Sequence, residues 1–226
     1  MASTYDALAN KLIGKISDEK QYWVALAGGP GAGKSTLAQA VASLVNQKLQ
    51  KQVCVVVPMD GFHYSREQLY RLDPPNAPNL MPRRGAPWTF DAEQLCCALT
   101  EAKQNGQASL PVYSRQASDP ICDGVQICEH HRLVVVEGNY LLYLDDPRWA
   151  PLKQLWDESW FLRCNSTAEQ RRRLIHRHLE TWNDEKTRRW GPGEVGAAAR
   201  ADANDVKNME MIAGCEKYAD LVIDSR

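Results

Sequence analysis

The amino-acid sequence predicts an α/β fold, in which helices cover both faces of a mostly parallel sheet of about five strands. Short runs of β-favouring apolar residues, such as 53–57 and 133–138, are typical of strands buried on both faces. Segments with helical periodicity separate these runs along the chain, as expected for consecutive βαβ units. The length of 226 residues suits one domain with a substantial core, so we expect a single domain over residues 1–226.

The expected elements follow in chain order from local patterns. Tyr5, Leu8, Leu12 and Ile16 recur at helical spacing and indicate an amphipathic helix at the start. The segment 73–88 is rich in proline and asparagine, so it cannot be helical throughout. The other expected elements are strands at 22–27, 53–57, 133–138, 159–164 and 219–224, helices at 34–48, 91–106 and 168–180, and an extended piece at 109–115.

A glycine-rich turn, GGPGAGKST at residues 28–36, joins the first strand to the helix that follows it. It fits the pattern G-x-x-x-x-G-K-[ST], in which backbone amides and a helix N-terminus surround a polyphosphate. Lys34 is expected to reach the β- and γ-phosphates, Ser35 to bind Mg²⁺ and Thr36 to contact the α-phosphate. The sequence therefore predicts a nucleoside triphosphate site formed by Gly28, Gly29, Pro30, Gly31, Ala32, Gly33, Lys34, Ser35 and Thr36.

Two carboxylates that follow buried strands extend this prediction. Glu137 ends the run LVVVEG, as in a Walker B strand whose acid organises Mg²⁺, although a strand-end glutamate can also make a purely structural hydrogen bond. Asp60, in MDGFHY, either forms an Asx turn or accepts a proton from a substrate hydroxyl, and the two roles are compatible. Arg173 and Arg177 are four residues apart on a helix and are candidates for neutralising phosphate charge.

Several other classes of protein are disfavoured. The guanine-reading motif N-K-x-D and the transporter signature LSGGQ are absent, and no apolar run is long enough to cross a bilayer. The net charge of −1 argues against recruitment by nucleic acid or by an anionic membrane. The first residues lack the pattern of a signal peptide, and no cysteines form a C-x-x-C pair, so a cytoplasmic protein is expected. Cys128, His130 and His131 form half of a metal-site pattern for which no second half is evident.

Together these motifs resemble the P-loop kinases grouped with uridine kinase, bacterial-type pantothenate kinase and phosphoribulokinase, over nearly all of the chain after residue 20. MDGFHY resembles the segment that carries their catalytic aspartate, and NLMPRRGAPWTFD resembles a pantothenate kinase segment. PVYSR is similar to a uridine kinase piece with an acceptor-contacting tyrosine, and RRRLIHRHLE resembles the start of the lid. The greatest similarity is to a nucleoside/nucleotide-kinase-like branch that includes kinases assigned to fructose uptake systems.

The resemblance implies a P-loop three-layer sandwich with a small helical lid at about residues 171–200. It also implies ATP and Mg²⁺ as cofactors, and transfer of the γ-phosphoryl group to a hydroxyl of a sugar, a nucleoside or a pantothenate-like alcohol. Asp60 becomes the base that receives the hydroxyl proton, while Lys34, Arg173 and Arg177 bind phosphate. The acceptor contacts that it suggests are Asp60, His63, Tyr64, Arg84, Tyr113 and Glu137.

Some points stay open at this level. Asn204, Asp205 and Asn208 resemble an N-D-x-x-N stretch of that branch, which holds the adenine end of ATP, closes the lid or caps a helix. The segment SRQASDP departs from the uridine kinase pattern, so the acceptor is not identified. A nucleotide-dependent regulator without an acceptor is the alternative function, and an ATPase acting on macromolecules is a third. The resemblance leaves a homo-oligomer open, because related kinases form dimers and tetramers.

Overall fold

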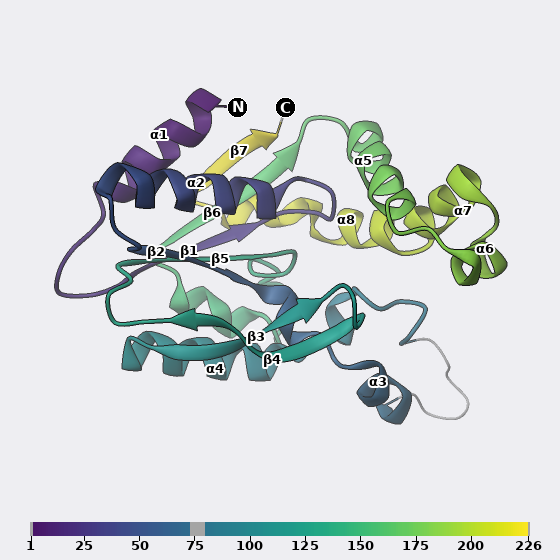
Figure 1. Cartoon of the computed structure of the whole chain (residues 1–226), viewed down its shortest axis with the longest axis horizontal. Helices are drawn as coiled ribbons and strands as arrows, with labels where there is room; N and C mark the ends of the chain where they lie inside the picture. The colour runs from purple at the N-terminus through teal and green to yellow at the C-terminus, as the bar shows by residue number, and fades with distance from the viewer. Residues whose placement is uncertain (1, 73–79, 226) are drawn as a thin grey trace.

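The chain forms one five-stranded parallel sheet with helices on both faces, as the sequence predicts (Figure 1). This computed structural model describes residues 2–72 and 80–225, so the expected loop at 73–88 lies partly outside the described residues. Its described part, 80–88, forms turns, and a short 3-10 turn follows at Pro87–Thr89. The strand order is β2 (Cys54–Pro58), β5 (Leu133–Gly138), β1 (Tyr22–Ala27), β6 (Glu158–Cys164) and β7 (Leu221–Ser225).

Strand β1 shows why the sheet is covered on both faces. Its side chains alternate between two separate hydrophobic clusters, with Val24 and Leu26 in one and Trp23 and Ala25 in the other. Helices α1 (Ala2–Ile13) and α2 (Lys34–Leu49) pack on the first face, and α4 (Ala92–Asn105) packs on the opposite face (Figure 1). Both faces are therefore buried against helices, which explains why the strand sequences are continuously apolar.

A two-stranded antiparallel hairpin lies outside the main sheet. Its strands are β3 (Ala108–Ser114), which was expected as an extended piece, and β4 (Asp119–Ile127), which was not predicted. The sequence of β4, DPICDGVQI, contains turn-favouring residues, and most of its side chains are exposed. Helix α3 (Arg66–Leu72) was also not predicted. The hairpin matters because it packs against the turn Met59–Phe62, which carries Asp60.

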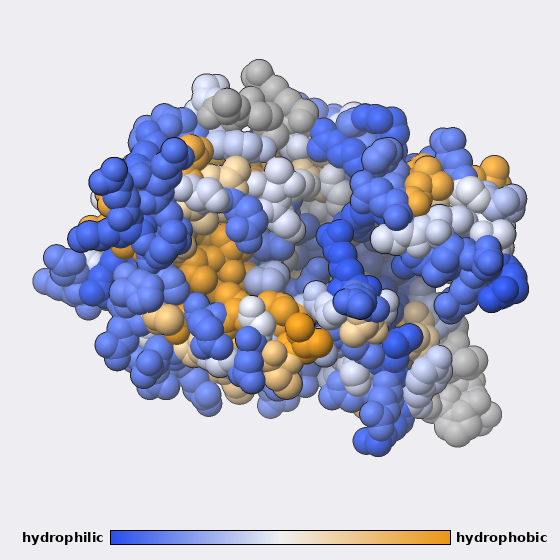
Figure 2. All heavy atoms as spheres, viewed as in Figure 1, coloured by the Kyte–Doolittle hydropathy of each residue, from blue (hydrophilic) through white to orange (hydrophobic). Residues whose placement is uncertain are grey.

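The C-terminal third forms a group of helices beside the sheet, at the right of Figure 1. They are α5 (Thr167–Leu179), α6 (Asp184–Trp190), α7 (Gly193–Arg200), a π-helical turn (Ala201–Asp205) and α8 (Val206–Ile212). Helices α5 and α7 share a small hydrophobic cluster of their own, made of Leu174, Ile175, Ala197 and Ala201. On the face drawn in Figure 2, this region is mostly hydrophilic, whereas apolar residues gather left of centre. Among the described residues, no helix combines the length and apolar character required to span a bilayer.

Candidate active site

The strand register brings the three predicted motifs to one edge of the sheet. Glu137 of β5 pairs with Leu26 of β1 on one side and with Pro58 of β2 on the other. The glycine-rich turn begins just after β1, and Asp60 lies two residues beyond Pro58. Because parallel strands end at the same edge, these groups meet around one cleft of about 270 Å³. Lys34, Ser35, Asp60 and Glu137 all line this cleft.

The glycine-rich turn has the backbone of a phosphate cradle. Gly31 and Gly33 have φ angles of +78° and +98°, a region that side chains other than glycine rarely adopt. Gly28 is required by space, since a Cβ atom there would lie 2.5 Å from the carbonyl oxygen of Leu162. Helix α2 begins directly afterwards at Lys34, so its free N-terminal amides face the turn. This arrangement is suited to binding a polyphosphate.

Lys34 and Ser35 are held by polar contacts within the cleft. The Lys34 Nζ donates hydrogen bonds to the Gly29 carbonyl at 3.1 Å and to Asn139 Oδ1 at 2.7 Å. The Ser35 hydroxyl donates to Glu137 Oε1 at 2.7 Å. Burial lowers the pKa of the Lys34 amine and raises the pKa of the Glu137 carboxyl, while each partly favours the charge of the other. A hydroxyl and a carboxylate are oxygen ligands of the kind that Mg²⁺ prefers, so these residues fit that ion.

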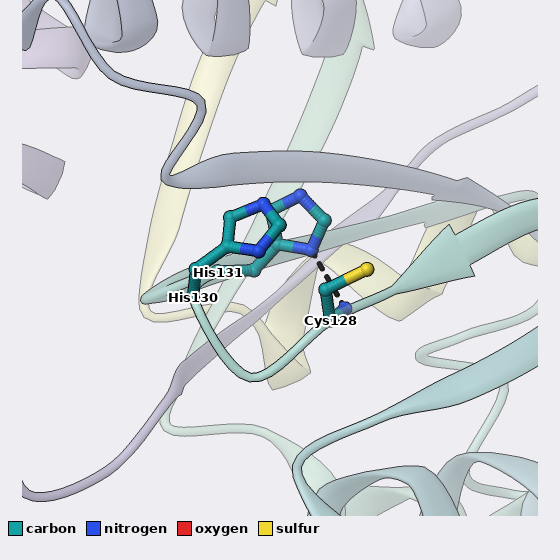
Figure 3. A group of neighbouring side chains, drawn as sticks. All are labelled: Cys128, His130 and His131. Atoms are coloured by element: carbon teal, nitrogen blue, oxygen red, sulfur yellow. Dashed lines mark hydrogen bonds between the residues drawn. The ribbon is translucent and has the colours of Figure 1, made fainter.

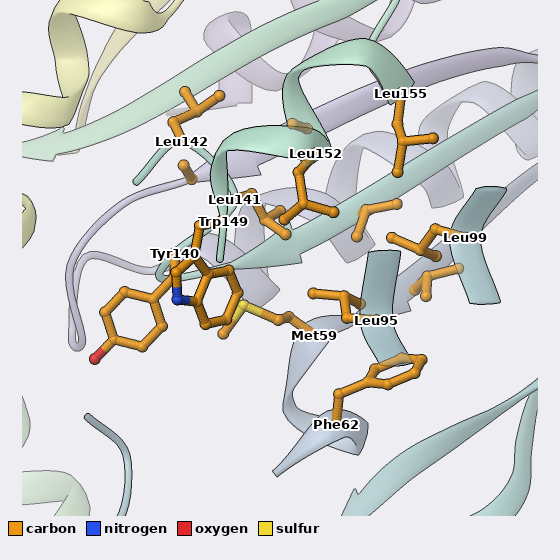
Figure 4. Close-up of a cluster of buried hydrophobic side chains, with 14 of the residues drawn as sticks. Met59, Phe62, Leu95, Leu99, Tyr140, Leu141, Leu142, Trp149, Leu152 and Leu155 are labelled. Carbon is orange, nitrogen blue, oxygen red and sulfur yellow. The ribbon is translucent and has the colours of Figure 1, made fainter. Parts of the chain in front are cut away.

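Asp60 is exposed to the cleft because its neighbours are anchored in the core. The turn Met59–Phe62 buries Met59 and Phe62, which are 0% and 2% exposed, within the cluster drawn in Figure 4. Gly61 permits a close approach to the hairpin, since a Cβ atom there would lie 2.0 Å from the Pro111 carbonyl oxygen. The Asp60 carboxylate is thus carried by a short turn that packs against the hydrophobic cluster and against the hairpin.

Three of the four suggested acceptor residues that flank Asp60 line the same cleft: His63, Arg84 and Tyr113. The His63 Nδ1 lies 2.8 Å from the Asp60 carbonyl, which can only accept, so Nδ1 carries the proton. Burial lowers the pKa of His63 and favours the neutral ring, whose centroid is 5.0 Å from that of Tyr113. Tyr64 is not with them, because its side chain lines a neighbouring hollow with Trp88.

Arg84 connects the acceptor side of the cleft to the hairpin. It forms a 2.6 Å ion pair with Asp119 and lies over the Tyr113 ring at 5.4 Å. Arg66 also hydrogen-bonds Asp119 through its backbone amide. Burial alone would raise the pKa of Asp119, but the hydrogen bonds from the two arginines outweigh it and hold this pKa below its ordinary value.

The two predicted lid arginines have different environments. Arg177 lines the cleft, with a guanidinium nitrogen 3.6 Å from Asp205. Arg173 is not among the cleft-lining residues; it donates to Glu169 at 2.9 Å and to the Ser225 hydroxyl at 2.9 Å. Its position outside the cleft lining gives no support to a contact between Arg173 and phosphate, which stays a prediction.

The stretch that contains Asn204 and Asn208 holds a loop in place. Asn204 donates to the Arg84 carbonyl at 2.7 Å, and Arg83 donates to Asn208 Oδ1 at 3.0 Å. Asp205 occupies the N-cap position of α8, but its side chain makes no capping hydrogen bond there. These contacts join the segment 83–85 to the C-terminal helices across more than a hundred residues of sequence.

Sequence reasoning missed several residues that line the cleft. Asn139 comes directly after the Walker B glycine, and its position past a strand end was a usable signal. No local pattern marks the others. They are Arg115, His178 and Arg200.

Cys128, His130 and His131 form a second group of potential ligands, at the start of β5 (Figure 3). One ligand atom from each residue lies within 4.8 Å of the others. The backbone amide of Cys128 donates to His131 Nδ1 at 2.9 Å, so one imidazole nitrogen already has a structural role. In the described part of the chain, no fourth histidine, cysteine or carboxylate joins this group.

Comparison with known proteins identifies the family, although no family model matches the chain. A protein of Schizosaccharomyces pombe named "putative uridine kinase" is 33% identical over 98% of this chain and 90% of its own length. A pantothenate kinase of Ligilactobacillus salivarius is 27% identical over 68% of this chain and 48% of its own length. Among solved structures, a "putative fructose transport system kinase" of Silicibacter sp. TM1040 has a TM-score of 0.80 and 31% identity, covering 97% of this chain and 98% of that one.

The similarity to the solved structure supports the fold described above. The regulator without an acceptor finds no support among them. The chain belongs to the P-loop kinases that include uridine kinase and pantothenate kinase, and it is an ATP-dependent enzyme that transfers a phosphoryl group to a hydroxyl of a small metabolite.

Proposed function

We propose that Asp60 is the general base of this phosphotransferase. The observation that carries the proposal is the convergence of Asp60, Lys34 and Glu137 on one cleft. Phosphoryl transfer requires an acceptor hydroxyl that is oriented in line with the phosphate and a nearby group that receives its proton. Asp60 is exposed to the cleft on a rigid turn, which suits it to that role.

The nucleotide is bound by the amides of residues 28–36 and by Lys34, whose buried amine is directed by Gly29 and Asn139. Ser35 and Glu137 would hold Mg²⁺, which neutralises charge on the phosphates when bound. Arg177 is placed to neutralise further charge on the transferred group, and helices α5 to α7 act as a lid that excludes water. The whole chain, residues 1–226, then works as one kinase domain.

The acceptor is a small alcohol that contacts His63, Arg84 and Tyr113. The names of the relatives suggest uridine, pantothenate and sugars as the first compounds to test. The balanced net charge of −1 argues against recruitment by nucleic acid or membrane. The seven cysteines are free thiols, which supports a cytoplasmic protein, and a homo-oligomer is compatible with the fold.

The test is release of ADP from Mg·ATP by the purified chain with a panel of sugars, nucleosides, pantothenate-like alcohols and hydroxy acids. We expect at least one compound to stimulate turnover and to appear as a phosphorylated product. Asp60→Asn should lower that turnover by about 10²-fold or more, because a positioned base contributes on this order. Affinity for a non-hydrolysable ATP analogue should change less than about twofold.

Asp18→Asn is a matched control, because Asp18 is exposed and lines a hollow outside the cleft. Wild-type turnover in Asp60→Asn with the best acceptor would refute the base assignment. A chain that hydrolyses ATP without any acceptor being phosphorylated would refute the proposed acceptor site.

A further inference from the structure

Four arginines line the cleft, but they differ in how their charge is balanced. Arg84 pairs with Asp119 at 2.6 Å, and Arg177 lies 3.6 Å from Asp205. Arg115 and Arg200 have no side-chain hydrogen bond or ion pair with any residue that the structure describes. Two guanidinium groups therefore line the cleft without a directly bonded carboxylate.

The unpaired arginines lie on the acceptor side of the cleft. Arg115 is the first residue of the turn after β3, two residues beyond Tyr113, and both residues line the cleft. Tyr113 contributes to the electrostatic environment of Arg200, and Arg177 contributes to the environments of both Arg200 and Lys34. Arg177 is thus coupled electrostatically to both Lys34 and Arg200, and Arg115 and Arg200 line the cleft together with Tyr113 and Asp60.

The position of Arg200 is electrostatically unfavourable in the free chain. Burial lowers the pKa of Arg200, Asp205 partly opposes this, and Arg177 and Arg189 add repulsion. The acid nearby is already engaged, because Asp205 accepts a 2.7 Å hydrogen bond from His178. Arg200 ends helix α7 immediately before the π-helical turn, a backbone irregularity that is frequent at functional sites. A bound anion would supply the missing counter-charge.

We infer that the phosphate acceptor carries an anionic oxygen group, a carboxylate or a phosphate, and that Arg115 and Arg200 bind this group while Asp60 faces the hydroxyl. Guanidinium groups recognise both anions through paired N–H donors, which explains the use of arginine at these positions. The inference rests on the proposed function and narrows its substrate class to small hydroxy acids or sugar phosphates.

The experiment compares acceptors in pairs in which one member carries an anionic group where the other carries a hydroxyl or hydroxymethyl group: glycerol with glycerate, pantothenol with pantothenate, and ribose with ribose 5-phosphate. We expect kcat/KM to favour the anionic member of at least one pair by about 10²-fold. The acid pairs and the phosphate pair separate the two possible anions. Arg115→Gln and Arg200→Gln should each lower that value by about 10- to 100-fold, the loss expected for a charged hydrogen bond.

Arg200→Lys keeps the charge and should restore part of the activity. Arg71→Gln is the matched control, because Arg71 pairs with Glu67 on the surface of α3, outside the cleft. KM for ATP should stay within about twofold in all four variants. A preference for the uncharged members would overturn the inference. So would an effect of Arg200→Gln on KM for ATP alone, which would make Arg200 a nucleotide contact.

A direct binding measurement separates this inference from the proposed function. Titration of the chain saturated with Mg·AMP-PNP by glycerate, and separately by inorganic phosphate, should show binding that both glutamine variants lose. If no acceptor is phosphorylated but this binding is present, the proposed function fails and the anion site stands. If neither anion binds at millimolar concentration, the anion site is refuted even where an uncharged acceptor is phosphorylated.

Discussion

The two halves of the cleft are built in different ways. The nucleotide half (residues 28–36 and 137–139) consists of one turn and one strand end, held by the register of adjacent strands. The acceptor half (residues 60–63, 83–85, 113–119 and 200–208) combines four distant segments. Side-chain bonds join them, including the pair of Arg84 with Asp119 and the bond from Asn204 to the Arg84 carbonyl.

This difference implies that binding of the nucleotide phosphates and selection of the acceptor depend on separate parts of the cleft. Backbone geometry determines the nucleotide half, so its function depends on a few residues that are close together in sequence. The acceptor half depends on long-range polar contacts, each of which can change without disturbing the sheet. We therefore expect substitutions in the first half to abolish phosphoryl transfer. Substitutions in the second half, apart from those of the proposed base Asp60, should alter acceptor binding selectively.

The largest effect is expected for Lys34→Ala in the nucleotide half. It removes the buried amine that is aimed at the phosphates, so kcat/KM for ATP should fall by about 10³-fold, as for loss of a preorganised charge donor. Lys48→Ala, on the surface of the same helix, is the control and should retain activity. Steady-state kinetics with the best acceptor measures both variants, and a loss below about tenfold in Lys34→Ala would contradict the assignment.

Gly61→Ala tests whether the acceptor half depends on contact between the turn and the hairpin. The new Cβ atom would meet the Pro111 carbonyl, so we expect a loss of about 1–3 kcal/mol in the free energy of unfolding and a lower kcat. Gly214→Ala is matched to it, because a Cβ atom there meets nothing within 4 Å. Urea unfolding would compare the two variants, and equal stability would show that the hairpin adapts freely.

Asp119→Asn tests whether acceptor binding can be weakened without a change in ATP binding. Loss of the ion pair with Arg84 should raise KM for the acceptor by about tenfold, while KM for ATP stays within twofold. Asp123→Asn, in the same strand of the hairpin, tests for a general effect of lost charge. A parallel rise in both KM values would mean that the two halves are not independent.

The smallest effect concerns pH. Burial lowers the folded-state pKa of His63 below its ordinary value of 6.5, so the unfolded chain binds a proton first as pH falls. The contribution of His63 to stability is therefore present above pH 6.5 and declines below it, by at most about 1.4 kcal/mol per pH unit. His63→Gln should reduce the slope of stability between pH 6.5 and 5.5, and His176→Gln, exposed on α5, should leave it unchanged.

The sequence patterns predicted the sheet more completely than the site. All five strands of the sheet occur within one or two residues of their expected positions, because buried parallel strands are apolar throughout. Strand β4 was missed because it is exposed and rich in turn residues. Of the residues predicted for the nucleotide half, Pro30, Lys34, Ser35 and Glu137 line the cleft, and Asn139 lines it without having been predicted. Arg115 and Arg200 had no local signal, and Tyr64 lines a different hollow from its expected partners.

Local chemistry in the chain thus specifies the phosphate cradle, the strand ends and the aspartate that follows the second strand, since each depends on neighbours within a few residues. Only folding determines which arginines face the acceptor and which are paired elsewhere. The physical reason is that ion pairing depends on distances between segments far apart in sequence, whereas strand periodicity and glycine φ angles are properties of the segment itself.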